Sequence, residues 1–180
     1  GVYASGFFQL NPEVPLFEAL SEKYIATPEM FAQAYGALDK KPVYMLMPYF
    51  SGLECTVDVA CMDGLIVSAV VRTKYKDGTQ MLELEHPCIE LAKKFVAHFA
   101  CSGIVGIQFI QDQQGEWLAL EINARASGGI GYTMATGVNI AAVLIDETLR
   151  KQKHKIFIQG RKWTESKVLI RSVSTAITLS

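Results

Sequence analysis

The chain has 180 residues, enough to bury a substantial core in one domain but short for two full domains. Its 17 lysine and arginine residues nearly balance 18 aspartate and glutamate residues, and the net charge of -1 gives no reason to expect a nucleic acid or an anionic membrane as a partner. Any phosphate binding must therefore be local. No apolar stretch approaches the ~20 residues of a membrane-spanning helix.

The four cysteines lie within apolar patterns and show neither a C-x-x-C motif nor the spacing of a Cys/His metal site; they are Cys55, Cys61, Cys88 and Cys101. We interpret them as buried free thiols, which are typical of a reducing, cytoplasmic compartment. The chain begins at "GVYASGFF" without a methionine. We therefore expect it to be a fragment of a longer protein.

The first predicted elements are a helix and a strand interrupted by proline. Thr27 is a candidate N-cap and Pro28 stands at the first helical position, which favours a helix over about 28–38. The following run "PVYMLMPYF" is apolar but contains Pro48, which cannot donate to a strand ladder. We expect a strand that ends near Met47 and passes into a hinge-like crossing segment.

The middle of the chain predicts a hairpin and then a helix. In "LECTVDVA" apolar and polar side chains alternate, and the turn "MDG" leads into the apolar run "LIVSAVVRT", so we expect two antiparallel strands. From His86 to Ser102 the apolar positions recur at helical spacing, with Pro87 at the start and Gly103 just past the end. We assign capping or surface roles to His86 and His98.

The last third predicts a second hairpin, a helix and two more strands. The strands "IVGIQFI" and "WLALEIN" are joined by the polar turn "QDQQGE". We expect a final helix in "NIAAVLIDETLRKQ" and strands in "KIFIQG" and "SKVLIRSV". This order indicates an α+β fold, an antiparallel sheet with helices packed on one face. We assign residues 1–150 to one lobe and residues 151–180 to a C-terminal strand extension packed on the same domain.

The second hairpin brings three polar side chains together. Period-two alternation assigns the aliphatic side chains of "WLALEIN" to the core face: Leu118, Leu120 and Ile122. Glu121 and Asn123 then share the other face, and Gln108 of the partner strand lies directly opposite Glu121 or diagonal to it. A carboxylate and two amides that converge suit a hard cation such as Mg²⁺. The alternative is that Glu121 and Asn123 form the solvent-facing half of an exposed strand.

The stretch after this strand, "ARASGGIGY", has small residues and glycines, which permit close approach of the backbone to a ligand. Arg125 places a guanidinium two residues beyond Asn123, where it is suited to a bidentate grip on a phosphate or a carboxylate. An ordinary surface salt bridge is the alternative for Arg125.

These motifs together resemble the ATP-grasp superfamily, and within it the large-subunit group of carbamoyl phosphate synthetases and related carboxylate–amine ligases. The "QF" strand and "EINARASGG" are similar to that family's metal-binding hairpin, which reads Q and then E-x-N-x-R. The resemblance implies that Gln108, Glu121 and Asn123 hold the Mg²⁺ (or Mn²⁺) ions that bridge the ATP phosphates. It implies that Arg125 faces the phosphates or the acyl phosphate. This chain has "NAR" where the family usually has "NPR".

The segment "MLMPYFSGLECTVD" is similar to the family's hinge around the adenine. The resemblance implies that backbone groups of Pro48 and Phe50 bond the adenine edge and that Glu54 accepts hydrogen bonds from the ribose hydroxyls. A solvated strand face is the alternative for Glu54. Arg72 and Lys74 resemble a basic pair near the triphosphate, with a disordered charged turn as the alternative.

The first residues, "GVYASGFF", resemble the trailing part of the family's glycine-rich lid, although a plain turn would also fit. The phosphate-binding lysines that precede this loop in the family are absent from the chain, so residues 1–150 are similar to the C-terminal nucleotide- and metal-binding lobe alone. The resemblance implies an ADP-forming ligase that activates a carboxylate as an acyl phosphate for attack by an amine, with this fragment inactive alone. A nucleotide-binding or regulatory module without turnover and a purely structural domain are the alternatives.

Overall fold

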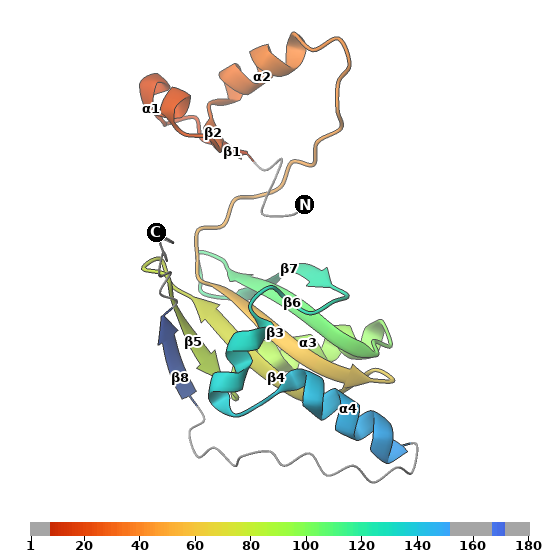
Figure 1. The fold of residues 1–180 in the computed structure, drawn as a ribbon. Helices are drawn as coiled ribbons and strands as arrows, with labels where there is room; N and C mark the ends of the chain where they lie inside the picture. Colours follow the sequence, from red (N-terminus) through yellow and green to blue (C-terminus); the bar gives the residue numbers. More distant parts are fainter. Residues whose placement is uncertain (1–7, 152–166, 172–180) are drawn as a thin grey trace, which may run out of the picture. The chain divides into compact units, whose positions relative to one another are not determined.

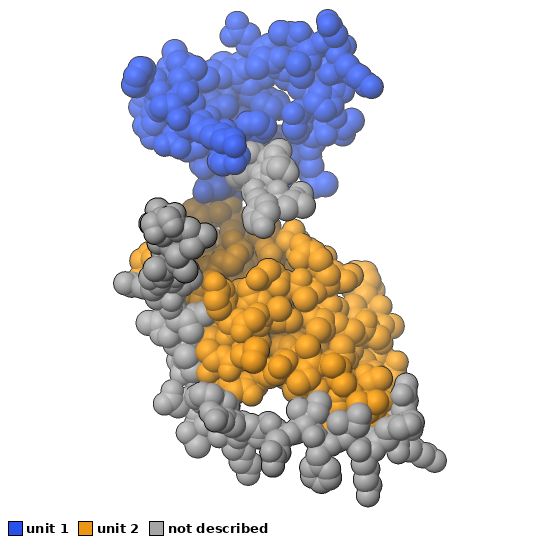
Figure 2. All heavy atoms as spheres, viewed as in Figure 1, with its two compact units in different colours: residues 1–49 blue, residues 50–180 orange. Residues whose placement is uncertain are grey.

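The computed structural model describes residues 8–151 and 167–171, and the chain divides into two compact units, residues 1–49 and residues 50–180 (Figure 1, Figure 2). The predicted lid at the start of the chain and the predicted strand in "KIFIQG" lie outside the described residues. The division of the chain at residue 150 stays a prediction.

The first unit contains two short helices and a pair of very short strands. Its elements are β1 (Gln9–Leu10), α1 (Leu16–Ser21), β2 (Ile25–Ala26) and α2 (Pro28–Gly36). β1 pairs with β2 in parallel. The hydroxyl of Thr27 accepts a hydrogen bond from the Met30 backbone nitrogen at 3.2 Å and so caps α2. The helix predicted over about 28–38 is thereby confirmed.

The strand predicted to end near Met47 does not form, and this prediction was wrong. Residues 41–50 have no regular secondary structure, and Val43 and Met45 are 98% and 84% exposed. A strand gains stability only beside a pairing partner. Within the described part of this unit, β1 and β2 pair only with each other. Pro42 and Pro48 also remove backbone donors near both ends of the run.

The second unit is built on a six-stranded antiparallel sheet in the order β7-β6-β3-β4-β5-β8 (Figure 1). Its strands are β3 (Glu54–Met62), β4 (Leu65–Lys74), β5 (Thr79–Glu83), β6 (Gly103–Gln111), β7 (Trp117–Asn123) and β8 (Lys167–Arg171). Both predicted hairpins are confirmed, and β8 lies within the predicted strand "SKVLIRSV". The turn of the first hairpin places Asp63 and Gly64 at positive φ, 51° and 79°, which is typical of tight hairpin turns.

Helices cover both faces of this sheet (Figure 1). The predicted α+β class is confirmed, but the expectation that the helices pack on one face is corrected. α3 (Pro87–His98) packs Ala92 and Val96 into a core with the first face of β3. On the second face, Ile140 of α4 (Ile140–Lys151) packs on Ala60 and Val70, beside the 3-10 helix η2 (Ile130–Thr136). Apolar side chains such as Ala60 and Val70 lie on the second face, and α4 buries them away from water.

The helices α3 and α4 begin at residues whose side chains cap them. His86 Nδ1 accepts a hydrogen bond from the Cys88 backbone nitrogen at 3.2 Å, so His86 caps α3 as predicted. His98 is exposed, also as predicted. Asn139 Oδ1 accepts from the Ala142 backbone nitrogen at 3.1 Å at the start of α4. No helix in the described ranges is both long enough and apolar enough to cross a lipid bilayer.

An extra residue in β7 changes which side chains share a face. Gln108 pairs with Glu121, but Phe109 pairs with Ala119, so a bulge leaves Leu120 without an opposite residue. As a result Leu118 lies on the face of Glu121, and Trp117 packs on the core of the α3 face. The expectation that the three aliphatic residues of β7 share a core face was therefore wrong, and each is 37–41% exposed.

The thiols are free, as predicted: Cys55, Cys61 and Cys88 are buried and Cys101 is half-buried. Cys55 Sγ donates a hydrogen bond to Cys88 Sγ at 3.4 Å. This bond lowers the pKa of Cys88 to about 6, aided by His86 and opposed by burial. The same bond, together with burial, raises the pKa of Cys55. The two thiols therefore form one interacting pair.

Candidate functional site

Most of the predicted site residues lie on one face of the sheet, which we call the polar face. In the register of the sheet, Glu54 is opposite Lys74, Thr56 is opposite Arg72 and Gln108, and Gln108 is opposite Glu121. Opposite residues in a sheet point to the same side. α4 covers only the other end of this face, so the polar side chains are gathered on the part that it leaves uncovered.

The three predicted metal ligands are neighbours on the edge hairpin β6–β7. Gln108 and Glu121 lie directly opposite each other, one of the two placements that the sequence predicts. Asn123 Nδ2 donates a hydrogen bond to Glu121 Oε1 at 2.6 Å. This bond uses the donor end of the amide, so Asn123 Oδ1 can serve as a cation ligand. Glu121 is exposed and the two amides are half-buried, which leaves the group accessible.

Glu54 and Lys74 form an ion pair in the wall of a hollow. Lys74 Nζ lies 2.6 Å from Glu54 Oε1, and the two side chains are 42% and 33% exposed. The hollow has a volume of about 470 Å³ and is lined by Ser51, Gly52, Leu53, Glu54, Lys74, Tyr75, Lys76 and Gln111.

Arg72 is buried in a network of hydrogen bonds beneath the polar face. Its Nε lies 2.6 Å from Asp58 Oδ2, and the exposed fractions are 3% for Arg72 and 0% for Asp58. Its two terminal nitrogens donate to Gln80 Oε1 at 3.1 Å and to Ser127 Oγ at 2.7 Å. Ser127 Oγ in turn donates to Asp58 Oδ1 at 2.6 Å. The network fixes the loop after β7 to the centre of the sheet.

Gly129 is required by the close approach of this loop to Arg72. A Cβ at this position would lie 2.2 Å from Arg72 Nη1, whereas a Cβ at Gly128 would have nothing within 4 Å. We predict that Gly129→Ala lowers the free energy of unfolding by about 1–3 kcal/mol, because the guanidinium must shift. Gly128→Ala should change it by less than about 0.5 kcal/mol. Urea unfolding of both variants checks this, and equal values would contradict the tight packing.

The remaining predicted residues lie outside the polar face. Arg125 is exposed in the loop after β7, where its Nη1 donates to the Ala126 carbonyl at 3.0 Å. Pro48 belongs to the first unit and Phe50 begins the second. Pro48 contributes to an apolar hollow of about 480 Å³ within the first unit, together with rings such as Phe31 and Tyr44.

Three residues of the network, Asp58, Gln80 and Ser127, were not predicted as site residues. Asp58 could be placed on the polar side of its strand by alternation, but nothing in the sequence shows that Arg72 turns inward to meet it. Arg72 and Lys74 both lie within β4, so neither belongs to a disordered turn. The small residues after Asn123 were a usable signal, because they permit the close packing that brings Ser127 to Asp58.

Solved structures of ATP-grasp enzymes are similar to part of this chain. The biotin carboxylase domain of the Hydrogenobacter thermophilus 2-oxoglutarate carboxylase is 18% identical, with a TM-score of 0.42 over 54% of this chain and 25% of that one. The ATP-grasp ligase PsnB, complexed with its precursor peptide PsnA2 and AMPPNP, is 19% identical, with a TM-score of 0.44 over 59% and 34%. The L-amino acid ligase from Bacillus licheniformis is 15% identical, with a TM-score of 0.43 over 62% and 32%.

The chain spans between a quarter and about a third of the length of these three structures. A family described as "ATP-grasp in the biosynthetic pathway with Ter operon" matches residues 40–167, which include the whole polar face and the hairpin β6–β7. Because this match covers more than half of the 180 residues, the chain belongs to that ATP-grasp family.

Proposed function

We propose that the intact protein is an ATP-dependent, ADP-forming ligase that joins a carboxylate to an amine. The observation that carries the proposal is the placement of Glu121 directly opposite Gln108, with Asn123 hydrogen-bonded to Glu121. A carboxylate and two amide oxygens on adjacent rigid strands are the donors that a hard cation prefers. Membership of an ATP-grasp family supports a nucleotide as the partner of that cation.

The reaction that we propose has two steps. A carboxylate oxygen attacks the γ-phosphorus of ATP, so that an acyl phosphate forms and ADP leaves. An amine then attacks the acyl carbon, phosphate leaves, and a proton is released from the nitrogen. When bound, Mg²⁺ or Mn²⁺ would neutralise negative charge on the phosphoryl oxygens. Glu121, Gln108 and Asn123 would hold the cation in place, and Arg125 would face the transferred group.

The nucleotide would lie along the polar face. Glu54, at the hollow, would accept hydrogen bonds from the ribose, and backbone groups of Pro48 and Phe50 would bond the adenine edge. Lys74 would lie near the triphosphate. For Arg72 the buried network supports a different role from the one that the sequence suggests: it would position the loop of Ser127 beside the nucleotide, because its guanidinium is already engaged.

Within this class we propose that the hairpin is like that of carbamoyl phosphate synthases, because it has Q and then E-x-N-x-R in the same order. The alternative is a nucleotide-binding or regulatory module without turnover. The two differ in one property: a ligase consumes ATP when its carboxylate and amine are both present, whereas a regulatory module only binds it.

The test is ADP release by the intact protein with MgATP, a panel of carboxylates and a panel of amines. We predict release that requires the metal and a carboxylate, and that yields an amide when an amine is added. Hydroxylamine traps an acyl phosphate as a hydroxamate and identifies the first step. MgATP binding without ADP release across the panel would contradict the ligase and favour the regulatory module.

A further inference from the structure

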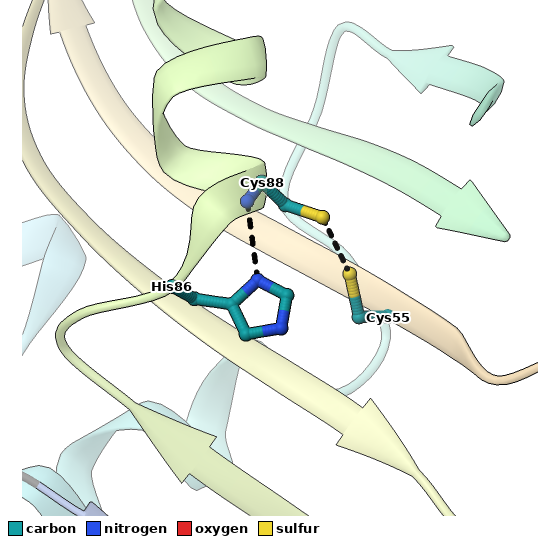
Figure 3. Close-up of side chains that lie close together, drawn as sticks. All are labelled: Cys55, His86 and Cys88. Atoms are coloured by element: carbon teal, nitrogen blue, oxygen red, sulfur yellow. Dashed lines mark hydrogen bonds between the residues drawn. The ribbon is translucent and has the colours of Figure 1, made fainter. Parts of the chain in front are cut away.

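Three potential metal ligands meet on the face of the sheet opposite the polar face. Figure 3 shows Cys55 of β3 beside His86 and Cys88, which stand at the start of α3. One ligand atom from each residue lies within 4.8 Å of the others, and the two sulfur atoms are 3.4 Å apart. Both cysteines are 0% exposed, and His86 is half-buried.

These distances suit a tetrahedral cation with sulfur and nitrogen ligands. Zinc binds thiolate sulfur at about 2.3 Å and imidazole nitrogen at about 2.0–2.1 Å, so ligand atoms of one tetrahedron lie roughly 3.5–3.8 Å apart. The observed sulfur separation of 3.4 Å is within a few tenths of an ångström of this spacing. The three ligand atoms lie within 4.8 Å of one another, so they could share one ion after movements of up to about 1 Å.

We propose that Cys55, His86 and Cys88 form a binding site for a thiophilic divalent cation of the Zn²⁺ class, separate from the nucleotide site. On binding, the two thiols would release their protons to solvent, and two metal–sulfur bonds and one metal–nitrogen bond would form. Two thiolates, a neutral imidazole and one divalent ion carry no net charge. Charge balance matters here, because both sulfur atoms lie against an apolar core that disfavours an isolated charge.

His86 offers one unprotonated ring nitrogen near the two sulfur atoms. Its Nδ1 accepts a hydrogen bond from the Cys88 backbone nitrogen, so this nitrogen is unprotonated and faces the start of α3. The proton of the neutral ring is then on Nε2, and an ion bound at Nδ1 would replace this hydrogen bond, because Nδ1 has only one lone pair. The fourth position of the tetrahedron would be filled by water from the half-exposed side of His86.

The ion would join α3 to β3 directly behind the polar face. Cys55 lies between Glu54 and Thr56, whose side chains point to the polar face. A metal bond at Cys55 would therefore hold the strand that carries Glu54 against the first turn of α3. Sequence spacing alone does not predict such a site, because the fold brings Cys55 to a pair that lies more than thirty residues further along.

The test is a titration of the reduced, chelator-treated full chain with Co²⁺, which reports thiolate ligation by a ligand-to-metal charge-transfer absorption. We predict one equivalent of bound Co²⁺ with that absorption and its complete displacement by Zn²⁺. Alkylation of the native protein should slow at Cys55 and Cys88 when Zn²⁺ is added, as measured by peptide mass spectrometry. Absence of the absorption, or a disulfide between the two cysteines in the protein as purified, would overturn the proposal.

Matched variants separate this site from the other thiols. Cys55→Ser, Cys88→Ser and His86→Asn should each lose at least tenfold in Co²⁺ affinity, and His86→Asn retains a side chain that can cap α3. Cys61→Ser removes a buried thiol that bonds the Gly103 carbonyl and should leave the affinity unchanged. Equal loss in Cys61→Ser and in Cys88→Ser would contradict the assignment. The alkylation experiment needs no variant and decides the matter where a variant fails to fold.

Discussion

Replacing Glu121 by glutamine is expected to weaken MgATP binding to the intact protein by about 100-fold or more, because groups that only support a metal ligand already contribute 10–100-fold. The substitution keeps the side-chain length and an acceptor for the Asn123 hydrogen bond, but it removes the negative charge. A carboxylate is the one charged donor among the three proposed ligands. Isothermal titration calorimetry in the presence of Mg²⁺ measures the loss.

Glu116→Gln is the matched control for this prediction. Glu116 is an exposed carboxylate in the turn of the same hairpin and is not one of the three proposed metal ligands. Its neutralisation should leave the MgATP affinity within about twofold, a difference well under 1 kcal/mol. Binding of ATP in chelator should be equally weak in the wild type and in Glu121→Gln. Unchanged MgATP affinity in Glu121→Gln would remove the main support for the metal site.

Replacing Arg72 by methionine is expected to lower the free energy of unfolding by about 3–5 kcal/mol, because it leaves the buried carboxylate of Asp58 without its charged partner. Asp58 has no exposed surface, so water cannot take the place of the guanidinium. The loop of Ser127 also loses one of its two bonds to the sheet. Urea or guanidinium unfolding, followed by circular dichroism, measures the change.

Two further variants make the cause identifiable. Lys74 lies on the same strand as Arg72 and forms a half-exposed ion pair with Glu54. Lys74→Met breaks this pair and should lower the free energy of unfolding by only about 0–1 kcal/mol. The double variant Arg72→Met with Asp58→Leu removes both buried charges and should regain part of the lost stability. A loss in Arg72→Met no larger than that in Lys74→Met would show that burial of the pair has little energetic weight.

The proximity of Gln108 and Glu121, directly opposite or diagonal, could be predicted from the sequence because a short polar turn and period-two alternation restrict the register. The same alternation misplaced Leu118, since one inserted residue reverses the faces on the far side of a bulge. Nothing in the local pattern marks that insertion: Leu120 looks like any other strand residue. Short-range rules therefore predicted the cluster but not the packing of the strand that carries it.

Long-range packing explains the other differences. The apolar run before Pro48 has the composition of a strand, but it has no partner within the described part of its unit. Arg72 is a residue type that often binds phosphate, but Asp58 of the neighbouring strand and Ser127, 55 residues further along the chain, engage its guanidinium. Gly129 has the small size that a tight contact needs, yet only the folded loop shows what it contacts.

The most direct measurement is a crystal structure of the intact protein with Mn²⁺ and a non-hydrolysable ATP analogue, using the anomalous scattering of manganese. We predict a peak within about 2.5 Å of side-chain oxygens of Glu121 and Asn123, with Gln108 beside it and phosphate oxygens completing the coordination. A saturated complex with its manganese bound elsewhere, and with these three side chains facing only solvent, would contradict the account.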